Sequence, residues 1–124
     1  MHEHHRLTVQ RFWATANARD WSAFGALLHP TLLYRVPQTR ELVRGRDGLV
    51  DVFSTWPGDW TAQVQTLVAD RDRAVSTIEF LVGSDTMTGI SFFDFDSGLI
   101  SRITDYWPSP YEPPARLSRW IERT

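Results

Sequence analysis

The 124 residues are enough for one domain with a sizeable core, and we expect residues 1–124 to form a single domain. Apolar residues make up 42% and charged residues 23% of the chain, as in ordinary globular proteins. The net charge of -2, with no run of like charges, gives no surface for nucleic acid or an anionic membrane. The absence of cysteine excludes disulfides, thiolate metal sites and cysteine nucleophiles. No stretch resembles a membrane span or a signal peptide, so we expect a cytoplasmic protein.

Apolar periodicity and turn residues predict helices and two short strands in the first half of the chain. Asp20 is a good N-cap for a second helix, His29 and Pro30 end that helix, and residues 56–58 form a strong turn signal. We expect helices at residues 3–19, 21–28 and 46–55, and strands at residues 32–36 and 41–44.

The second half of the chain is rich in β-strand patterns separated by turn residues. We expect strands at residues 61–68, 74–82, 86–95 and 99–107. Four prolines then predict an irregular segment, and residues 115–123 are expected to form one or two helical turns. Helices segregated from a meander of strands are typical of the α+β class.

Four short motifs lie at the junctions between these predicted elements. They are residues 17–21 (NARDW), 29–34 (HPTLLY), 43–49 (VRGRDGL), and 96–100 with 104–107 (DSGLI and TDYW). Their order resembles the nuclear transport factor 2-like superfamily, which includes ketosteroid isomerases, SnoaL-type polyketide cyclases and limonene-epoxide hydrolases. The resemblance implies a cone-shaped fold, in which N-terminal helices and a curved antiparallel sheet enclose an internal pocket.

Three polar groups act in the isomerases that this chain resembles, and all three matching positions are apolar here. The position of the general base matches Val36, that of a tyrosine on the first helix matches Phe12, and that of a protonated aspartate matches Ile90. The resemblance therefore argues against ketosteroid isomerisation by that mechanism.

The last predicted strand offers a different carboxylate. Trp107 matches a pocket-lining aromatic residue of the isomerases, and strand alternation then turns Ile103 and Asp105 inward as well. Burial raises the pKa of such a carboxyl, which suits a general acid or base near neutral pH. The alternative is that Asp105 lies at the rim of the pocket or pairs with an arginine in a structural role.

Two further side chains are candidates for the chemistry. Tyr34 can donate a hydrogen bond to a substrate oxygen, although a packed core tyrosine is the alternative. Glu79 faces the cone if Thr77 and Leu81 do, as the alignment to the isomerases favours; the depth of the cone favours Ile78 and Phe80 inside instead. If Glu79 lies inside, it could share a proton with Asp105.

Six tryptophans are many for this length, and they predict an aromatic-lined pocket for a hydrophobic small molecule. Their alternative role is in the core and a dimer interface, which we favour for Trp21 and Trp120. The residues expected to contact the ligand are Phe12, Trp13, Val36, Trp56, Trp60, Ile90, Phe92, Ile103 and Trp107.

We expect no metal and no cofactor. His2, His4 and His5 cluster at a terminus that we expect to be disordered, and His29 is expected to cap the second helix. The sequence holds no metal-ligand spacing, phosphate loop or serine-hydrolase motif.

A homodimer is expected, because a cone of this type leaves one sheet face open and we expect Phe93 and Phe95 on that face.

Three functions stay open. The first is a cofactor-free isomerase, cyclase or hydrolase that uses Asp105 as acid or base and Tyr34 as hydrogen-bond donor. The second is a non-catalytic module that binds a hydrophobic small molecule, and the third is a structural dimer with an unused pocket.

Overall fold

The computed structural model describes residues 2–124 and has the expected α+β class. Its helices are α1 (His2–Ala18), α2 (Trp21–Gly25) and α3 (Arg46–Ser54). Its strands are β1 (Leu28–Val36), β2 (Glu41–Arg44), β3 (Trp60–Ala69), β4 (Arg73–Val82), β5 (Asp85–Asp96) and β6 (Leu99–Tyr106). No helix in the described part of the chain is long and apolar enough to span a membrane.

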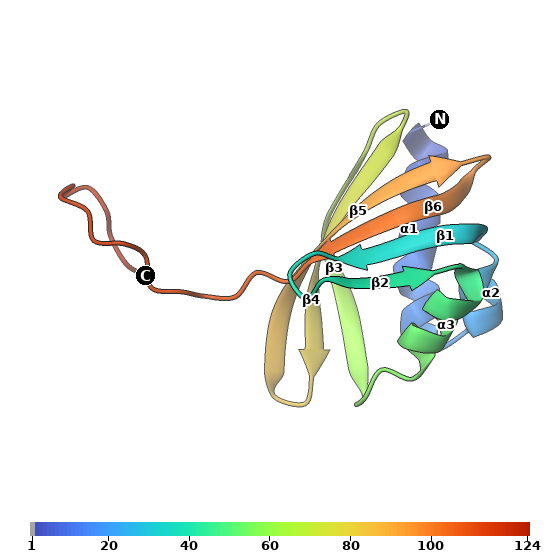
Figure 1. Ribbon diagram of the computed structural model, residues 1–124, viewed down its shortest axis with the longest axis horizontal. Helices are drawn as coiled ribbons and strands as arrows, with labels where there is room; N and C mark the ends of the chain where they lie inside the picture. The colour runs from blue at the N-terminus through green and yellow to red at the C-terminus, as the bar shows by residue number, and fades with distance from the viewer. Residues whose placement is uncertain (1) are drawn as a thin grey trace.

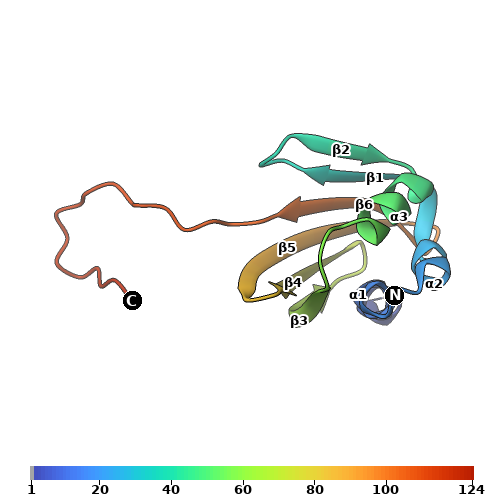
Figure 2. The ribbon, with the colours of Figure 1, turned by 90° about the horizontal axis from the view of Figure 1, so that it is seen from below.

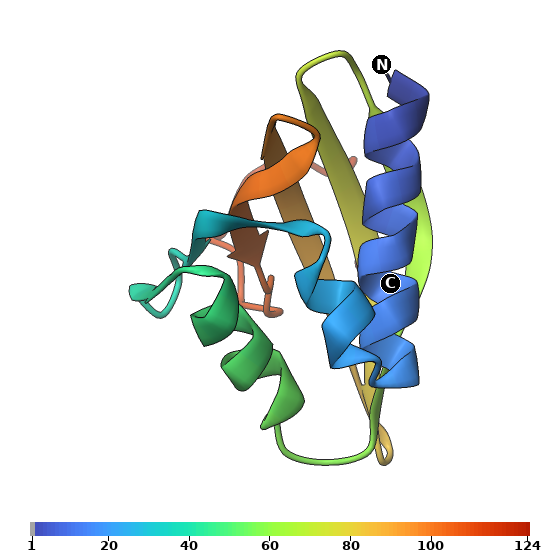
Figure 3. The ribbon, with the colours of Figure 1, turned by 90° about the vertical axis from the view of Figure 1, so that its right-hand side faces the viewer.

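The six strands form one curved sheet in the order β2-β1-β6-β5-β4-β3. Neighbouring strands are antiparallel, except that β1 and β6 run parallel. The sheet wraps around the helices, which all lie on its concave side (Figure 2). Helix α1 lies along β3 and β4, and α2 and α3 lie to one side of it (Figure 3). The core and the pocket therefore share the space between the helices and the concave face.

The break between α1 and α2 holds the first helix against the edge strand β3. The Asn17 side chain donates to the carbonyl of Ala62 and accepts from its N–H, both at 2.8 Å, as a neighbouring strand would. Arg19 adopts a positive φ of 59°, which lets its guanidinium donate to the carbonyl of Trp60 at 2.6 Å and lie 3.9 Å above the Trp60 ring. The motif at residues 17–21 thus fixes the end of α1 on β3.

Strand alternation places Phe93 in the core, so the expectation that it lies on the open face is wrong. Phe93 is fully buried and packs against Phe12, with ring centroids 5.3 Å apart. It pairs with Ile103 on β6, another buried residue, so the concave face includes both. Phe95 follows a register shift and stacks on His5 of α1, which also keeps it from the open face.

The N-terminal histidines lie in helix α1, so the expectation of a disordered terminus is wrong. The side chain of His2 lies outside the described part of the chain. His4 donates from Nε2 to the carbonyl of Gly98 at 3.0 Å, and His5 stacks on Phe95 at 3.8 Å. His29 lies in β1, because α2 ends at Gly25. It therefore does not cap the helix.

The C-terminal segment forms no helix, so the helical turns expected at residues 115–123 are wrong. Only a turn at residues 119–120 interrupts an irregular path. In Figure 1 this segment leaves the end of β6 and extends away from the body. A short helix is marginal without a surface to pack on, which accounts for its absence here.

We predict that Phe93→Ala lowers the free energy of unfolding by about 3–5 kcal/mol, the usual cost of emptying a buried aromatic site. Phe92→Ala is the matched control, because Phe92 is the half-buried neighbour on the opposite face. It should cost less than half as much. Urea denaturation of both variants measures the difference, and equal losses would contradict this placement.

Candidate active site

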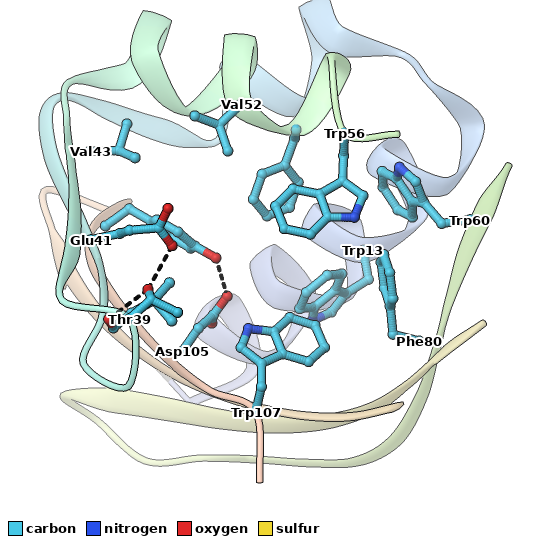
Figure 4. A pocket seen from close by; sticks show the side chains of 13 residues that line it. Trp13, Thr39, Glu41, Val43, Val52, Trp56, Trp60, Phe80, Asp105 and Trp107 are labelled. Atoms are coloured by element: carbon cyan, nitrogen blue, oxygen red, sulfur yellow. Dashed lines mark hydrogen bonds between the residues drawn. The ribbon is translucent and has the colours of Figure 1, made fainter. Parts of the chain in front are cut away.

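A cavity of about 180 Å3 lies between the concave face of the sheet and helix α3. The structure brings seven of the predicted site residues to its wall, and the side chains of six further residues complete it (Figure 4). The predicted seven are Trp13, Tyr34, Val36, Trp56, Trp60, Asp105 and Trp107. The six that were not predicted from the sequence are Thr39, Glu41, Val43, Val52, Phe53 and Phe80.

Asp105 lies at the floor of this cavity and is only 2% exposed. Both oxygens of its carboxylate accept a hydrogen bond from a hydroxyl. The Tyr34 hydroxyl donates to Oδ2, and the Ser91 hydroxyl donates to Oδ1 at 2.6 Å. No ion pair to Asp105 occurs among the described residues. The arginine pairing considered for this residue is therefore absent, and hydroxyls alone hold the carboxylate.

The sheet topology explains why these three groups meet. Strand β6 lies between β1 and β5, so residues of three strands converge at its centre. Ser91 on β5 is the cross-strand partner of Asp105, and Tyr34 on β1 is the parallel partner of Ile103, two residues before Asp105. All of these side chains point to the concave face because alternate residues of a strand share a face.

Burial governs the proton affinity of this group. It raises the pKa of Asp105 from 3.8 to about 6, although the hydrogen bonds from Ser91 and Tyr34 act in the opposite direction. Burial, together with the neighbouring Asp105, also raises the pKa of Tyr34 far above its ordinary value. Near neutral pH the aspartate is therefore ionised and the tyrosine keeps its proton, which matches the direction of their hydrogen bond.

A second buried hydroxyl lies next to this group on the same face. Ser76 is the cross-strand partner of Ser91 and accepts a hydrogen bond from Nε1 of Trp13 at 3.0 Å. Ser91 and Ser76 were not predicted as site residues. The signal in the sequence is their place at inward positions of neighbouring strands, but it becomes visible only once the register is known.

Aromatic rings form the walls above the carboxylate. Trp60 stacks on Phe80 with centroids 5.4 Å apart, and Phe80 meets the edge of Trp107 at 5.5 Å. Trp107 rests over Gly89, where an added Cβ would lie 2.9 Å from its ring. Gln38 fixes the Trp107 backbone by donating to its carbonyl at 3.0 Å and accepting from its N–H. These contacts hold the Trp107 ring at the side of the cavity.

Three predicted site residues lie on the opposite face of the sheet. Glu79 alternates with Phe80, which lines the cavity, so its carboxylate points away and cannot share a proton with Asp105. Ile90 and Phe92 lie on either side of the buried Ser91 in β5. Strand alternation therefore turns both side chains to the opposite face as well. The resemblance to the isomerases favours Glu79 inside, but the structure places the larger apolar Phe80 there instead, as the depth of the cone favours.

Two more predicted residues, Phe12 and Ile103, are fully buried in the core and are not part of the cavity wall. Phe12 fills the space between Phe24 and Phe93 and so supports the pocket from behind. Among residues 2–124, no three His, Cys, Asp or Glu side chains gather in a group that could hold a metal ion.

The chain matches known proteins in both sequence and structure. The family model of the SnoaL-like domain matches residues 9–103. A structure from Kribbella flavida, provisionally assigned as a ketosteroid isomerase, shares 35% identity over 99% of this chain and 91% of its own, with a TM-score of 0.93. No curated protein matches the chain in sequence.

Two more distant structures share the fold. A nuclear transport factor 2-like protein of unknown function from Burkholderia xenovorans is 21% identical over 98% of this chain and 96% of its own, with a TM-score of 0.82. An LEH-like epoxide hydrolase from M. tuberculosis is 17% identical over 86% of this chain and 84% of its own, with a TM-score of 0.74. Together with the family match, these similarities show that the chain belongs to the SnoaL-like domain family of the nuclear transport factor 2-like superfamily.

Proposed function

We propose that this protein is a cofactor-free enzyme that moves a proton on a small apolar carbonyl compound, with Asp105 as the general base. The observation that carries the proposal is the buried carboxylate of Asp105 at the floor of an aromatic cavity, held by two hydroxyls and without a cation. A general base works best when its pKa lies near the working pH. A pKa of about 6 meets that condition.

The reaction begins with the ionised form of Asp105. The carboxylate removes a proton from the carbon beside the carbonyl. The electron pair of the broken C–H bond forms a C=C bond, and the π pair of the C=O bond moves to the carbonyl oxygen. Asp105 then returns the proton to the same carbon or to another carbon of the conjugated system. Return to the same carbon is exchange once the proton on Asp105 has been replaced by one from solvent, and return to another carbon is isomerisation. Neither needs a reactant other than water.

Two donors are available for the negative charge on the substrate oxygen. Trp107 is part of the cavity wall. Its indole N–H has no hydrogen bond among the described residues and is therefore available to a ligand. The Tyr34 hydroxyl is occupied by Asp105 in the resting state. Once Asp105 is protonated, its own O–H can donate to Tyr34, whose hydrogen is then free for the substrate. Donors aimed at a developing oxyanion contribute strongly to catalysis.

The cavity limits the substrate to a small and mostly apolar molecule. A volume of about 180 Å3 is comparable with the roughly 150 Å3 cavity that holds a benzene ring, so one or two fused rings fit. The walls are the rings of Trp56, Trp60, Phe80 and Trp107, which suit a flat molecule. The assignment of the Kribbella flavida protein as an isomerase agrees with this reaction class.

The second candidate is a binding module without turnover. It is favoured by the apolar side chains at the three positions where the resembling isomerases carry catalytic groups, namely Phe12, Val36 and Ile90. Such a module would use the same cavity for the same class of ligand. Turnover therefore separates the two functions, and binding does not.

We predict that the native protein accelerates exchange of the α-hydrogens of 2-indanone and 2-tetralone in deuterated buffer, as measured by NMR. The rate should rise with pH through about 6 and then level off, because only ionised Asp105 accepts a proton. Asp105→Asn should lower the rate by about 100-fold or more.

Glu79→Gln is the matched control for this experiment, since it removes a carboxylate from the opposite face of the same sheet. It should exchange both ketones at the native rate. Tryptophan fluorescence reports binding independently, because four tryptophans line the cavity. Quenching by both ketones without exchange above the buffer rate would reject the enzyme and leave the binding module.

We also predict that Asp105→Asn stabilises the protein at neutral pH. The folded pKa of about 6 lies above the ordinary 3.8, so the folded chain binds this proton more tightly than the unfolded chain. As the pH rises from 4 to 6, the free energy of unfolding of the native protein should therefore decrease. Above pH 6 it should stay at this lower value. Asparagine can still meet both hydroxyls and has no charge to bury. At pH 7.5 the variant should be more stable by about 3 kcal/mol.

Urea denaturation at pH 4 and pH 7.5 measures this effect. The advantage of the variant should vanish near pH 4, where the native carboxyl is protonated in the folded state. A variant that is less stable than the native protein at pH 7.5 would show that the carboxylate is a net stabilising group, contrary to this prediction. Glu79→Gln again serves as the control for removing a carboxylate from the sheet.

A further inference from the structure

The last residues of the chain, 108–124, form a C-terminal arm that leaves the body at the end of β6. Figures 1 and 2 show it extending away from both the sheet and the helices. Every hydrogen bond, ion pair and ring contact described for the arm stays within it, such as the pair of Arg123 with Glu112 at 3.1 Å. The arm therefore has no partner in its own body among the described residues.

The arm displays large apolar side chains to solvent. Tyr111 is 81% exposed, Trp120 is 82% exposed, and Leu117 is fully exposed. Ile121 is a fourth apolar side chain on the same segment. Side chains of this kind, gathered on one exposed segment, mark a contact with another surface.

The direction of the arm is fixed at its root. Gln38 binds both backbone groups of Trp107, the residue before the arm, and the Trp107 ring rests over Gly89. Pro108 and Pro110 follow at once, and proline restricts the backbone to extended paths. The chain is thus aimed outward and cannot easily fold back on its own cavity.

A related protein supports a defined path for the arm. The Kribbella flavida structure covers 99% of this chain, so the match includes the arm. The arm is roughly a seventh of the 124 residues, and a TM-score of 0.93 could not be reached if it followed a different path there. An outward arm without support from its own body keeps one path only when another molecule holds it.

We propose that this other molecule is a second copy of the same chain, so that two chains exchange their arms in a homodimer. In a two-fold dimer each contact occurs twice, and aromatic side chains bury about 150–250 Å2 each. Two arms with four apolar side chains each remove on the order of 2,000 Å2, counting both partners, which is the area of a stable interface. The open sheet face with Ile90 and Phe92 provides apolar surface on the receiving chain.

The first experiment measures the dissociation constant of the dimer by analytical ultracentrifugation. The double variant Leu117→Ser, Trp120→Ser removes two anchors from each arm and should raise that constant by about 100-fold or more. Glu122→Gln changes an exposed arm residue without removing apolar surface and should leave it unchanged. Because the arm is not bound to its own body, the double variant should keep the circular dichroism and unfolding midpoint of the native monomer.

The second experiment asks where the arm lies. The chain has no cysteine, so Ser118→Cys gives a single site for a nitroxide label. This chain is mixed with native chain that carries nitrogen-15 but no nitroxide. Any broadening of the amide signals is then intermolecular. We expect broadening on the body of the enriched chain, at residues of the outer sheet face.

A native chain that sediments as a monomer at 10-micromolar concentration would overturn the proposal. A dimer that the double variant does not weaken would also overturn it, since the arm would then not hold the dimer together. In a control sample, the nitroxide-labelled chain itself carries nitrogen-15 and is diluted with native chain that carries neither label. Broadening in this control but not in the first mixture would show that the arm folds back on its own body, and it would equally reject exchange.

Discussion

Burial of the Asp105 carboxylate between β1 and β5 is the constraint on which the rest of the site depends. A buried charge without a counter-ion opposes folding unless hydrogen bonds compensate for the lost water. Here the hydroxyls of Tyr34 and Ser91 supply one hydrogen bond to each carboxylate oxygen. They reduce the cost of burial but do not cancel it, because the pKa stays raised. Stability that the core supplies elsewhere is thus used to hold an ionisable carboxyl at the cavity floor.

The cavity wall and the C-terminal arm meet at one residue. Trp107 forms part of the wall beside Phe80, and its backbone is also the root from which the arm departs. Its ring has room only because position 89 is a glycine. A partner that holds the arm would therefore also restrict the side chain that faces the ligand, which connects assembly with binding through a single rigid junction.

The buried carboxylate of this chain lies on a different strand from the catalytic groups of the isomerases that it resembles. The positions that carry catalytic groups in those proteins are distributed here among three environments. Val36 lines the cavity, Phe12 is in the core behind it, and Ile90 lies on the opposite face. The carboxylate enters from β6 instead. Similarity to the family consequently defines the shape of the pocket, while the inward positions of each strand define its chemistry.

The sequence by itself determined the order of the helices and strands of the body and the α+β class, because apolar periodicity and turn residues act locally. The resemblance to the isomerases led to Asp105 and Tyr34, since it assigned Trp107 and Val36 to the pocket and one assigned residue sets the parity of a whole strand. Only the tertiary structure decided which faces of β4 and β5 point inward, since Glu79 and Phe93 lie in strands where both faces carry large apolar side chains. Ser91 became a partner of Asp105 through strand register, and the arm lost its expected helix because no surface of its own chain lies beside it. Pairing between distant strands and the absence of a packing surface are not encoded in any local pattern.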